Sequence, residues 1–444
     1  MMRLVFSDLR DHAATWLGAF FVAVGCGYIG GWAASIAATL APYPNLQTLV
    51  WEVIVFSSFA AVAVLVSAAN LTVSVQRRSY ALWQLANVDP RLVSAVVLAQ
   101  LVVVALLGAV CGTLLEAATY VPLFPWAFSS PYYQPIDQVV VDVGLPLMPI
   151  AWLGVAGVFL LGGLKGAHGA GSTPPLVALS EPEPQRKGMT LSRVLVFAGL
   201  AIGTFQLASF MVSAGSDAAL EVSLFLPILM VAMLVPAAPL VLSAVLRAWT
   251  ALVPQARWNA WYLARHTARY GLSTSTSVET PVMVGFGLVA GIYSSVSVWA
   301  AWARLQGDAD FNGIDFTSSL LLLGGPILLC AIGAAVSVVM TSRSRTRDVA
   351  LLIASGARPQ TMLGAAVCEA LIHAVTATLV GAAAVVASNA TIAYAVGLPL
   401  FANLAFGEGL VVSLAGFVLV LTATLVPTCA ALNKEPAAVL TLQE

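Results

Sequence analysis

The side chains that could act as nucleophiles, proton carriers or metal ligands are few and widely spaced in this sequence. No two cysteines form a CxxC pair and the four histidines form no HExxH pattern, so neither a disulfide framework nor a metal site is predicted. A single cysteine in an apolar run is typically a small buried hydrophobe. We therefore predict no catalytic residues and no bound metal. The cysteines are Cys26, Cys111, Cys330, Cys368 and Cys429.

The sequence also lacks the phosphate-binding loop of ATPases. Residues 162–171 are rich in glycine and contain Lys165, but no Ser or Thr follows that lysine. A P-loop needs the lysine and hydroxyl together to hold phosphate and Mg²⁺. The chain is thus predicted not to be an enzyme and to bind no cofactor itself.

Acidic side chains fall near the ends of the apolar runs, where a charge costs little to place. Most of them need no functional role. Glu369 is the exception, because it follows an arginine-rich segment and could pair with one of its arginines. The acidic residues near apolar runs are Glu52, Glu116, Asp142, Glu221, Glu279, Glu369 and Glu408.

The chemistry that the sequence does offer is a charged segment that occurs twice. Residues 76–112 align without a gap with residues 345–381, so that Pro90 falls on Pro359 and Gly112 on Gly381. In the second copy, alternating arginines and an apolar run predict a short amphipathic helix. Gly356 should end that helix in a left-handed turn, and Pro359 cannot continue it. The charged and turn residues are Arg77, Arg78, Asp89 and Arg91 in the first copy and Arg343, Arg345, Arg347, Asp348, Gly356 and Arg358 in the second.

Such an element suits docking into a groove on a cytosolic partner. Arginines at the inner membrane surface also follow from the positive-inside rule alone, and that explanation stays open. The repetition of the whole element favours docking.

The composition requires membrane-spanning elements around these segments. Hydrophobic residues make up 60% of the chain and charged residues 9%, and the mean hydropathy is +0.94. A soluble domain carries roughly a quarter charged residues. We predict an all-α polytopic membrane protein with about ten spans. The apolar runs are 16–38, 48–75, 92–116, 142–164, 192–213, 219–246, 280–303, 318–341, 364–396 and 406–431.

The positive charges predict the orientation of these spans. With a cytoplasmic N-terminus, all but one of the 19 Lys and Arg residues fall on the inside, and only Arg304 lies outside. We therefore expect cytoplasmic N- and C-termini in a cell membrane. The alanine- and arginine-rich, lysine-poor composition suggests a high-GC bacterium, and nucleic-acid binding is an unsuitable role.

The repeat gives the spans a 4+2+4 arrangement with a parallel internal repeat. Residues 1–180 form a degraded first four-helix repeat, 181–254 a two-helix linker pair and 255–444 the second repeat. A linker is expected within 162–187, which is rich in Gly, Pro and Ser. Residues 3–12 and 258–270 could lie along the inner membrane surface. The first span of each repeat also contains a GxxxG pair for close helix packing, which is Gly27 with Gly31 and Gly287 with Gly291.

The largest outer loop is expected at 117–141, which is rich in proline and aromatic residues. Such a loop could rest on the bilayer surface as a rigid cap, or it could hold an extracellular or membrane partner.

The second copy resembles the FtsX-like permease domain of the MacB, FtsX, LolC and BceB group of ABC transporter permeases. The resemblance rests on an arginine-rich stretch, an acidic-x-Ala-Leu-Leu-x-Ala-x-Gly-Ala pattern, a following Glu and a terminal Pro. The first copy departs from it, because Asn87, Asp89 and Gln100 stand at the positions of Gly356, Arg358 and Glu369. The matching residues are Arg345, Arg347, Asp348, Ala350, Leu351, Leu352, Gly356, Ala357, Glu369 and Pro436.

The resemblance implies a permease subunit that works with a separate cytosolic ATPase, in two copies, which would hold ATP and Mg²⁺. It implies export or extraction of an amphipathic lipid or peptide, although the sequence does not identify the substrate. One alternative is an FtsX-like mechanotransmitter that regulates an extracellular partner such as a cell-wall hydrolase. A secondary transporter is a weaker alternative, because no ionisable residue stands at mid-bilayer on a broken helix.

Overall fold

The computed structural model describes residues 7–10, 12–129, 139–172, 190–254, 258–270, 272–307 and 316–432. Within these ranges the protein is helical and contains no strand, as the composition predicted. Two compact units can be recognised, unit 1 with residues 1–183 and 315–340 and unit 2 with residues 184–314 and 341–444.

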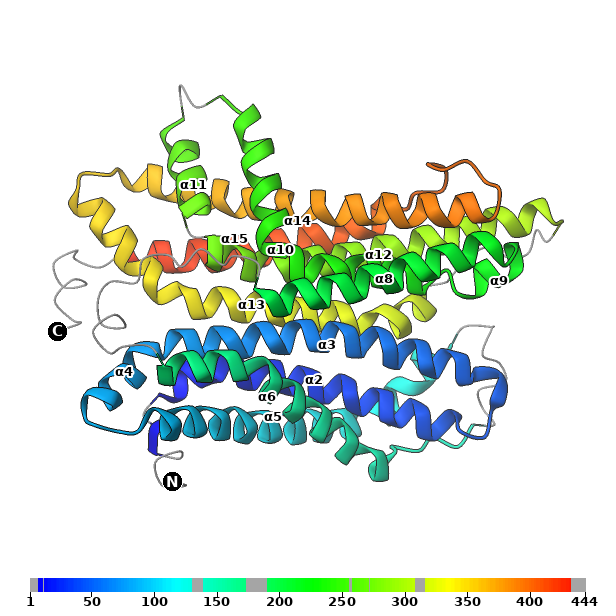
Figure 1. The fold of residues 1–444 in the computed structure, drawn as a ribbon, viewed down its shortest axis with the longest axis horizontal. Helices are drawn as coiled ribbons and strands as arrows, with labels where there is room; N and C mark the ends of the chain where they lie inside the picture. Colours follow the sequence, from blue (N-terminus) through cyan, green and yellow to red (C-terminus); the bar gives the residue numbers. More distant parts are fainter. Residues whose placement is uncertain are drawn as a thin grey trace. The chain divides into compact units, whose positions relative to one another are not determined.

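Unit 1 is built from four long helices that run side by side (Figure 1). Helix α2 packs on α3, α5 and α6, and α5 also packs on α6. Their shared core includes Ala19, Val22, Leu101 and Phe159, all fully buried. The helices are α2 (Ala13–Leu40), α3 (Gln47–Val75), α4 (Arg77–Leu85), α5 (Pro90–Ala127) and α6 (Met148–Ser172). Short 3-10 turns at Pro44–Leu46 and Leu145–Leu147 precede α3 and α6.

Unit 2 is built around three mutually packed helices and α10. Helices α12, α14 and α15 pack on one another, and α10 packs on α8, α12 and α14. Helix α10 contains Pro236 and Pro239 and bends along its length (Figure 1). The helices are α8 (Leu191–Ser213), α9 (Ser216–Glu221), α10 (Phe225–Leu252), α11 (Asn259–Tyr270), α12 (Leu272–Leu305), α14 (Pro359–Ala395) and α15 (Phe406–Leu432).

Helix α13 (Phe316–Ala354) belongs to both units, to unit 1 through residue 340 and to unit 2 from residue 341. In unit 1, Leu329 and Val336 join the buried core. A Cβ added at Gly333 would lie 2.8 Å from Val64 Cγ1. The first part of α13 thus packs with the helices of unit 1.

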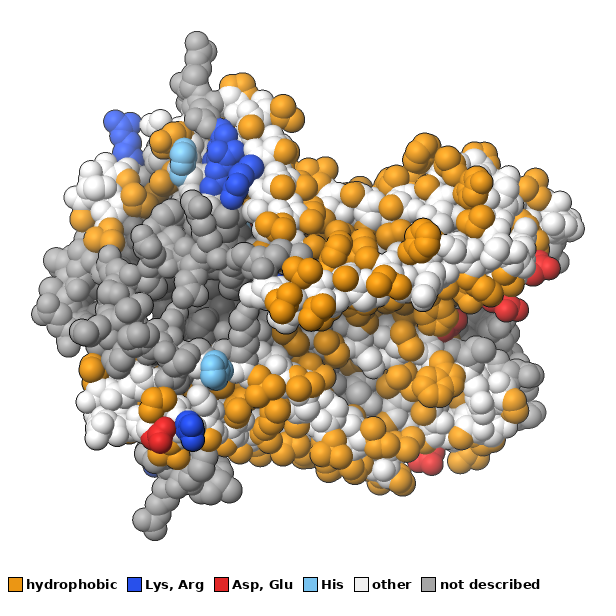
Figure 2. All heavy atoms as spheres, viewed as in Figure 1, with side chains coloured by type: hydrophobic (Ala, Val, Ile, Leu, Met, Phe, Trp, Pro, Cys, Tyr) orange, Lys and Arg blue, Asp and Glu red, His pale blue; other side chains and the backbone are white. Residues whose placement is uncertain are grey.

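Nine described helices are long and apolar enough to cross a membrane. Each corresponds to one of the ten predicted runs. The remaining run lies in α13, where the described apolar stretch is the shorter Leu321–Val336, so a tenth span stays a prediction. Exposed apolar side chains cover much of the surface in Figure 2, and on α8 they include Leu195 and Phe205, 64% and 73% exposed. A surface of this kind suits a multi-pass membrane protein.

The expected outer loop at 117–141 is wrong in its first part, because α5 continues to Ala127. Tyr120, Phe124 and Phe128 follow one another at four-residue spacing and are all buried. The ring of Phe124 contacts the rings of both Tyr120 and Phe128. Tyr120 also donates to Thr39 Oγ1 at 3.0 Å. This aromatic stripe holds the helix across Pro122 and Pro125. Residues 130–138 lie outside the described ranges.

The expected linker at 162–187 also begins as helix, since α6 reaches Ser172. Its glycines permit close packing instead of flexibility. A Cβ at Gly162 would lie 2.9 Å from Val66 Cα, and one at Gly163 would lie 2.2 Å from Leu101 Cδ1. Residues 173–189 are outside the described part of the chain.

Candidate functional site

The first copy of the repeated segment forms a hinge, residues 86–89, between α4 and α5. Asn87 takes the left-handed conformation, with φ of 64°. The Asn87 N–H donates to the carbonyl of Gln84 and the Val88 N–H to the carbonyl of Trp83. These bonds are the paired contacts of a Schellman turn, which satisfies the last carbonyls of a helix. Asp89 then caps α5 by accepting from the Arg91 N–H at 2.7 Å.

The second copy forms a hinge, residues 355–358, with the same backbone geometry. Gly356 has φ of 95°, as its position in the sequence predicted. Its N–H donates to the carbonyl of Ile353, and the Ala357 N–H donates to the carbonyl of Leu352. Each bond falls at the aligned position of the first hinge. The two copies are therefore equivalent in backbone structure although their turn residues differ.

Four of the sequence-predicted docking residues lie on or directly beside these hinges. Asp89, Arg91, Gly356 and Arg358 are exposed. The side chains of the remaining predicted docking residues lie outside the described part of the structure, although their backbone belongs to α4 and α13. These are Arg77, Arg78, Arg343, Arg345, Arg347 and Asp348.

Replacing Gly356 with alanine should destabilise the second hinge by about 1–2 kcal/mol, because a Cβ is strained at positive φ. The thermal unfolding midpoint of the purified protein in detergent measures this. Gly407→Ala is the matched control, since no atom lies within 4 Å of an added Cβ there. Asn87→Gly should leave the first hinge intact, because glycine adopts the left-handed conformation without strain. Equal midpoints for Gly356→Ala and Gly407→Ala would contradict the assignment.

A buried polar network joins the first hinge helix to its neighbours. Gln100 Nε2 donates to Asp8 Oδ2 at 2.7 Å, so α5 is tied to the helical residues 7–10. The Tyr80 hydroxyl on α4 donates to Gln76 and also reaches Gln100 Oε1 at 3.5 Å. Burial, and secondarily the Asp8 carboxylate, raises the pKa of Tyr80, which therefore keeps its proton for donation. The hinge helix α4 and α5 are thus linked by side chains that are hardly exposed.

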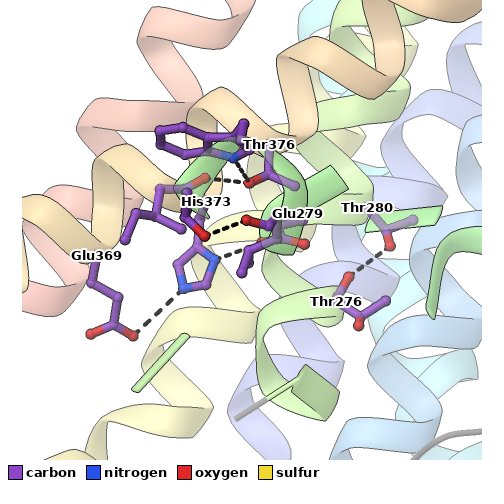
Figure 3. Close-up of polar contacts among 10 residues, drawn as sticks. Thr276, Glu279, Thr280, Glu369, His373 and Thr376 are labelled. Atoms are coloured by element: carbon purple, nitrogen blue, oxygen red, sulfur yellow. Dashed lines mark hydrogen bonds and ion pairs between the residues drawn. The ribbon is translucent and has the colours of Figure 1, made fainter. Parts of the chain in front are cut away.

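At the aligned position in the second copy, Glu369 belongs to a different buried cluster, shown in Figure 3. His373 Nδ1 lies 2.8 Å from Glu279 Oε1, and His373 Nε2 lies 3.5 Å from Glu369 Oε1. The three residues are at most 6% exposed. We call them the Glu-His-Glu cluster. It joins α12, which carries Glu279, to the beginning of α14.

The two ring nitrogens of His373 face different carboxylates, so the ring bridges them. An imidazole that donates from both nitrogens carries both protons and one positive charge. A cation placed between two carboxylates lessens the cost of burying them. Within the described residues, no group of His, Cys, Asp and Glu is arranged to hold a metal ion. The cluster is suited to holding two helices in register.

One turn beyond the cluster, Thr376 connects α14 to α10. The Trp249 Nε1–H donates to Thr376 Oγ1 at 2.9 Å, and Trp249 packs edge-on against Trp261 of α11. Together with the cluster, this contact ties the first half of α14 to α10, α11 and α12. These contacts link the helix that follows the second hinge to several helices of unit 2.

The sequence prediction singled out Glu369 but missed His373 and Glu279. The spacing of Glu369 and His373 is a signal that was available, because residues four apart share one face of a helix. Glu279 carries no such signal, since it is 94 residues away from its histidine partner. Pairing of Glu369 with an arginine of 343–358 stays a prediction, as the side chains of Arg343, Arg345 and Arg347 are not among the described ones.

Glu116 differs from the expected placement of acidic residues near span ends, because its span runs from Pro90 to Ala127, whereas Glu279 lies at the start of its span as expected. Glu116 is fully buried within α5 and accepts from the Ser35 hydroxyl at 2.8 Å. The sequence predicts a span end at Glu116, because the proline-rich residues that follow it are typical of a loop.

The GxxxG glycines lie at close helix contacts in both units. A Cβ added at Gly27 would lie 2.5 Å from the carbonyl oxygen of Ala109, and one at Gly31 would lie 2.9 Å from Glu116 Oε2. At Gly287 and Gly291 the nearest atoms are side-chain carbons of Val231 and Pro227, both at 2.6 Å. Gly27 therefore allows the backbones of α2 and α5 to approach closely. Gly287 and Gly291 instead leave room on α12 for side chains of α10.

Comparison with known proteins identifies the segment that contains the second hinge. Residues 320–436 match the family model described as FtsX-like permease C-terminal. The match includes α14, α15 and Glu369 with His373, and it confirms the family resemblance seen in the sequence. No curated protein matches this chain.

Proposed function

We propose that this chain, which carries an FtsX-like permease C-terminal domain at residues 320–436, is the membrane subunit of an ABC transporter that works with a separate ATPase. The observation that carries the proposal is the pair of hinges with the same backbone hydrogen-bond pattern. Two equivalent rigid turns suit two copies of one partner. Under this proposal the partner holds ATP and Mg²⁺.

The hinges are well placed to transmit motion. Each precedes a long helix, α5 or α14, that begins with proline directly after the turn. A force on the turn therefore acts on a continuous helix of 38 or 37 residues. The buried polar contacts near the start of each helix then carry the displacement to α4 and residues 7–10, or to α10, α11 and α12.

The membrane setting and direction of transport follow from the same proposal. The hinges, the N-terminus and the C-terminus would face the cytoplasm of a bacterial cell, in agreement with the distribution of Lys and Arg. The substrate would be an amphipathic lipid or peptide that is exported or extracted from the bilayer, as the resemblance to FtsX-like permeases implies.

Reversing the charges of Arg343, Arg345 and Arg347 to glutamate tests the docking assignment. We expect the affinity for the cognate ATPase to fall by roughly tenfold or more, because like charges across an interface oppose association. Co-purification and ATPase stimulation, both measured with the full-length chain in detergent, report the effect.

Arg304→Glu is the control for a general charge effect. Arg304 is exposed in the last turn of α12, and the sequence places it on the opposite membrane side from the hinges. This variant should bind and stimulate the ATPase as the unmodified protein does. Unchanged binding and stimulation in the triple variant would overturn the docking role.

A further inference from the structure

Helix α11 and the end of α10 bring three arginines together. Arg265 and Arg269 lie one turn apart on α11, and Arg269 Nη2 donates to the carbonyl of Arg247 and to Thr250 Oγ1, both at 3.1 Å. Figure 2 shows Lys and Arg side chains gathered over α10 and α11. We call Arg247, Arg265 and Arg269 the arginine cluster.

The cluster contains hydrogen-bond donors that lack acceptors. Arg265 is only 7% exposed. Its Nε, the Nε of Arg269 and the indole nitrogen of Trp261 are buried and have no hydrogen-bond partner in the described structure. These three residues follow one another at four-residue spacing on α11. A buried donor without an acceptor costs free energy, and a charged one costs more.

The charges of the cluster are also unbalanced. Among the described residues, none of the three arginines forms an ion pair with a carboxylate. Burial, and then the nearby Arg265 and Arg247, lowers the pKa of Arg269. Arginine nevertheless stays protonated in proteins. The three cations therefore repel one another, and a multivalent anion would both relieve the repulsion and supply the missing acceptors.

The surroundings of the cluster fit the headgroup layer of a membrane. Helix α10 ends its apolar span at Leu252, which is 84% exposed. Trp258, which directly precedes α11, and Tyr262 on α11 are 68% and 51% exposed. Tryptophan and tyrosine prefer the interface between hydrocarbon and water, and a short helix with such a face lies along the interface. Lipid phosphates occupy the same depth.

We propose that the arginine cluster binds the phosphate group of an anionic membrane lipid. Guanidinium groups form paired hydrogen bonds with phosphate oxygens, which accept several donors at once. Acyl chains of the same lipid would lie against the exposed apolar residues at the end of α10. The proposal concerns the chain alone and does not depend on an ATPase partner.

Lipid at this site would also stabilise the region that follows the second hinge. Helix α11 packs on α14, where the Cβ of Ala260 approaches Gly364. Trp261 and Ile372 share one buried cluster. A lipid that fixes α11 therefore fixes the beginning of α14, and the anionic lipid content of the membrane would tune the stiffness of that helix.

The test compares full-length protein in nanodiscs of phosphatidylcholine with protein in nanodiscs that also contain phosphatidylglycerol. We expect phosphatidylglycerol to raise the thermal unfolding midpoint and to remain bound in native mass spectrometry. In Arg265→Gln and Arg269→Gln, phosphatidylglycerol retention should fall roughly tenfold, since each lost charged contact weakens binding by about that factor. In phosphatidylcholine alone Arg265→Gln should be no less stable than the unmodified protein, because it relieves repulsion, whereas Arg269→Gln also loses the hydrogen bonds to the Arg247 carbonyl and Thr250.

Arg304→Gln serves as the matched control and should retain phosphatidylglycerol fully. Equal retention and stabilisation in the cluster variants and the control would overturn the proposal. Inorganic phosphate, added to protein in phosphatidylcholine nanodiscs, forms the second arm. A phosphate-induced rise in midpoint equal to that from phosphatidylglycerol would overturn the assignment to a lipid, whereas no rise would support it.

Discussion

Replacing His373 with leucine is expected to lower the free energy of unfolding by about 3–5 kcal/mol, because it leaves the buried Glu279 carboxylate without the imidazole nitrogen that lies 2.8 Å from it. Glu279 is 2% exposed and Glu369 6% exposed, so water cannot take the place of the ring. Repulsion between the two carboxylates would separate α12 from the beginning of α14. Chemical or thermal unfolding of the purified protein in detergent measures the loss.

Two further variants make this result specific. His266→Leu removes an exposed histidine of α11 and should change stability by less than about 0.5 kcal/mol. Combining His373→Leu with Glu279→Gln and Glu369→Gln removes the buried charges and should recover part of the loss. If the His373→Leu variant has the same unfolding midpoint as the unmodified protein, the Glu-His-Glu cluster does not hold α12 and α14 together.

Replacing Gly112 with alanine is expected to cost about 3 kcal/mol, the upper part of the range for overpacked sites. The added Cβ would lie 2.2 Å from the carbonyl oxygen of Val24 and 2.6 Å from the backbone nitrogen of Tyr28. Both obstacles are backbone atoms of α2, so the two helices must move apart. The unfolding midpoint and the size-exclusion elution profile of the protein in detergent measure this loss of stability.

The aligned glycine of the second repeat gives a graded comparison. A Cβ added at Gly381 would lie 2.8 Å from Phe286 Cδ1 and 3.1 Å from Met283 O. The Phe286 ring can shift to make room for it. Gly381→Ala should therefore cost about 1 kcal/mol. Gly154→Ala, where no atom lies within 4 Å, should be neutral or stabilising by about 0.5–1 kcal/mol, since alanine favours helix. Equal midpoints for Gly112→Ala and Gly154→Ala would refute the close contact.

Local signals predicted much of this molecule. The hinge at Gly356 could be predicted because a left-handed turn and a following proline are properties of neighbouring residues. The equivalent turn at Asn87 was not predicted, because the first copy departs from the pattern at that position, although asparagine tolerates the left-handed conformation. The end of α5 was misjudged because Pro122 and Pro125 suggested a loop, whereas buried contacts of Tyr120 and Phe124 kept the helix intact.

By itself, the sequence determined the membrane class, nine of the spans, the duplicated hinges and the family resemblance, since apolar length, charge distribution and repetition all act along the chain. Only the tertiary structure decided that Glu279 meets His373, that Gly112 meets the backbone of α2 and that the first part of α13 packs in unit 1. These contacts join segments far apart in sequence. Their geometry depends on how apolar helices pack, and the spacing of residues within one helix does not encode its partner.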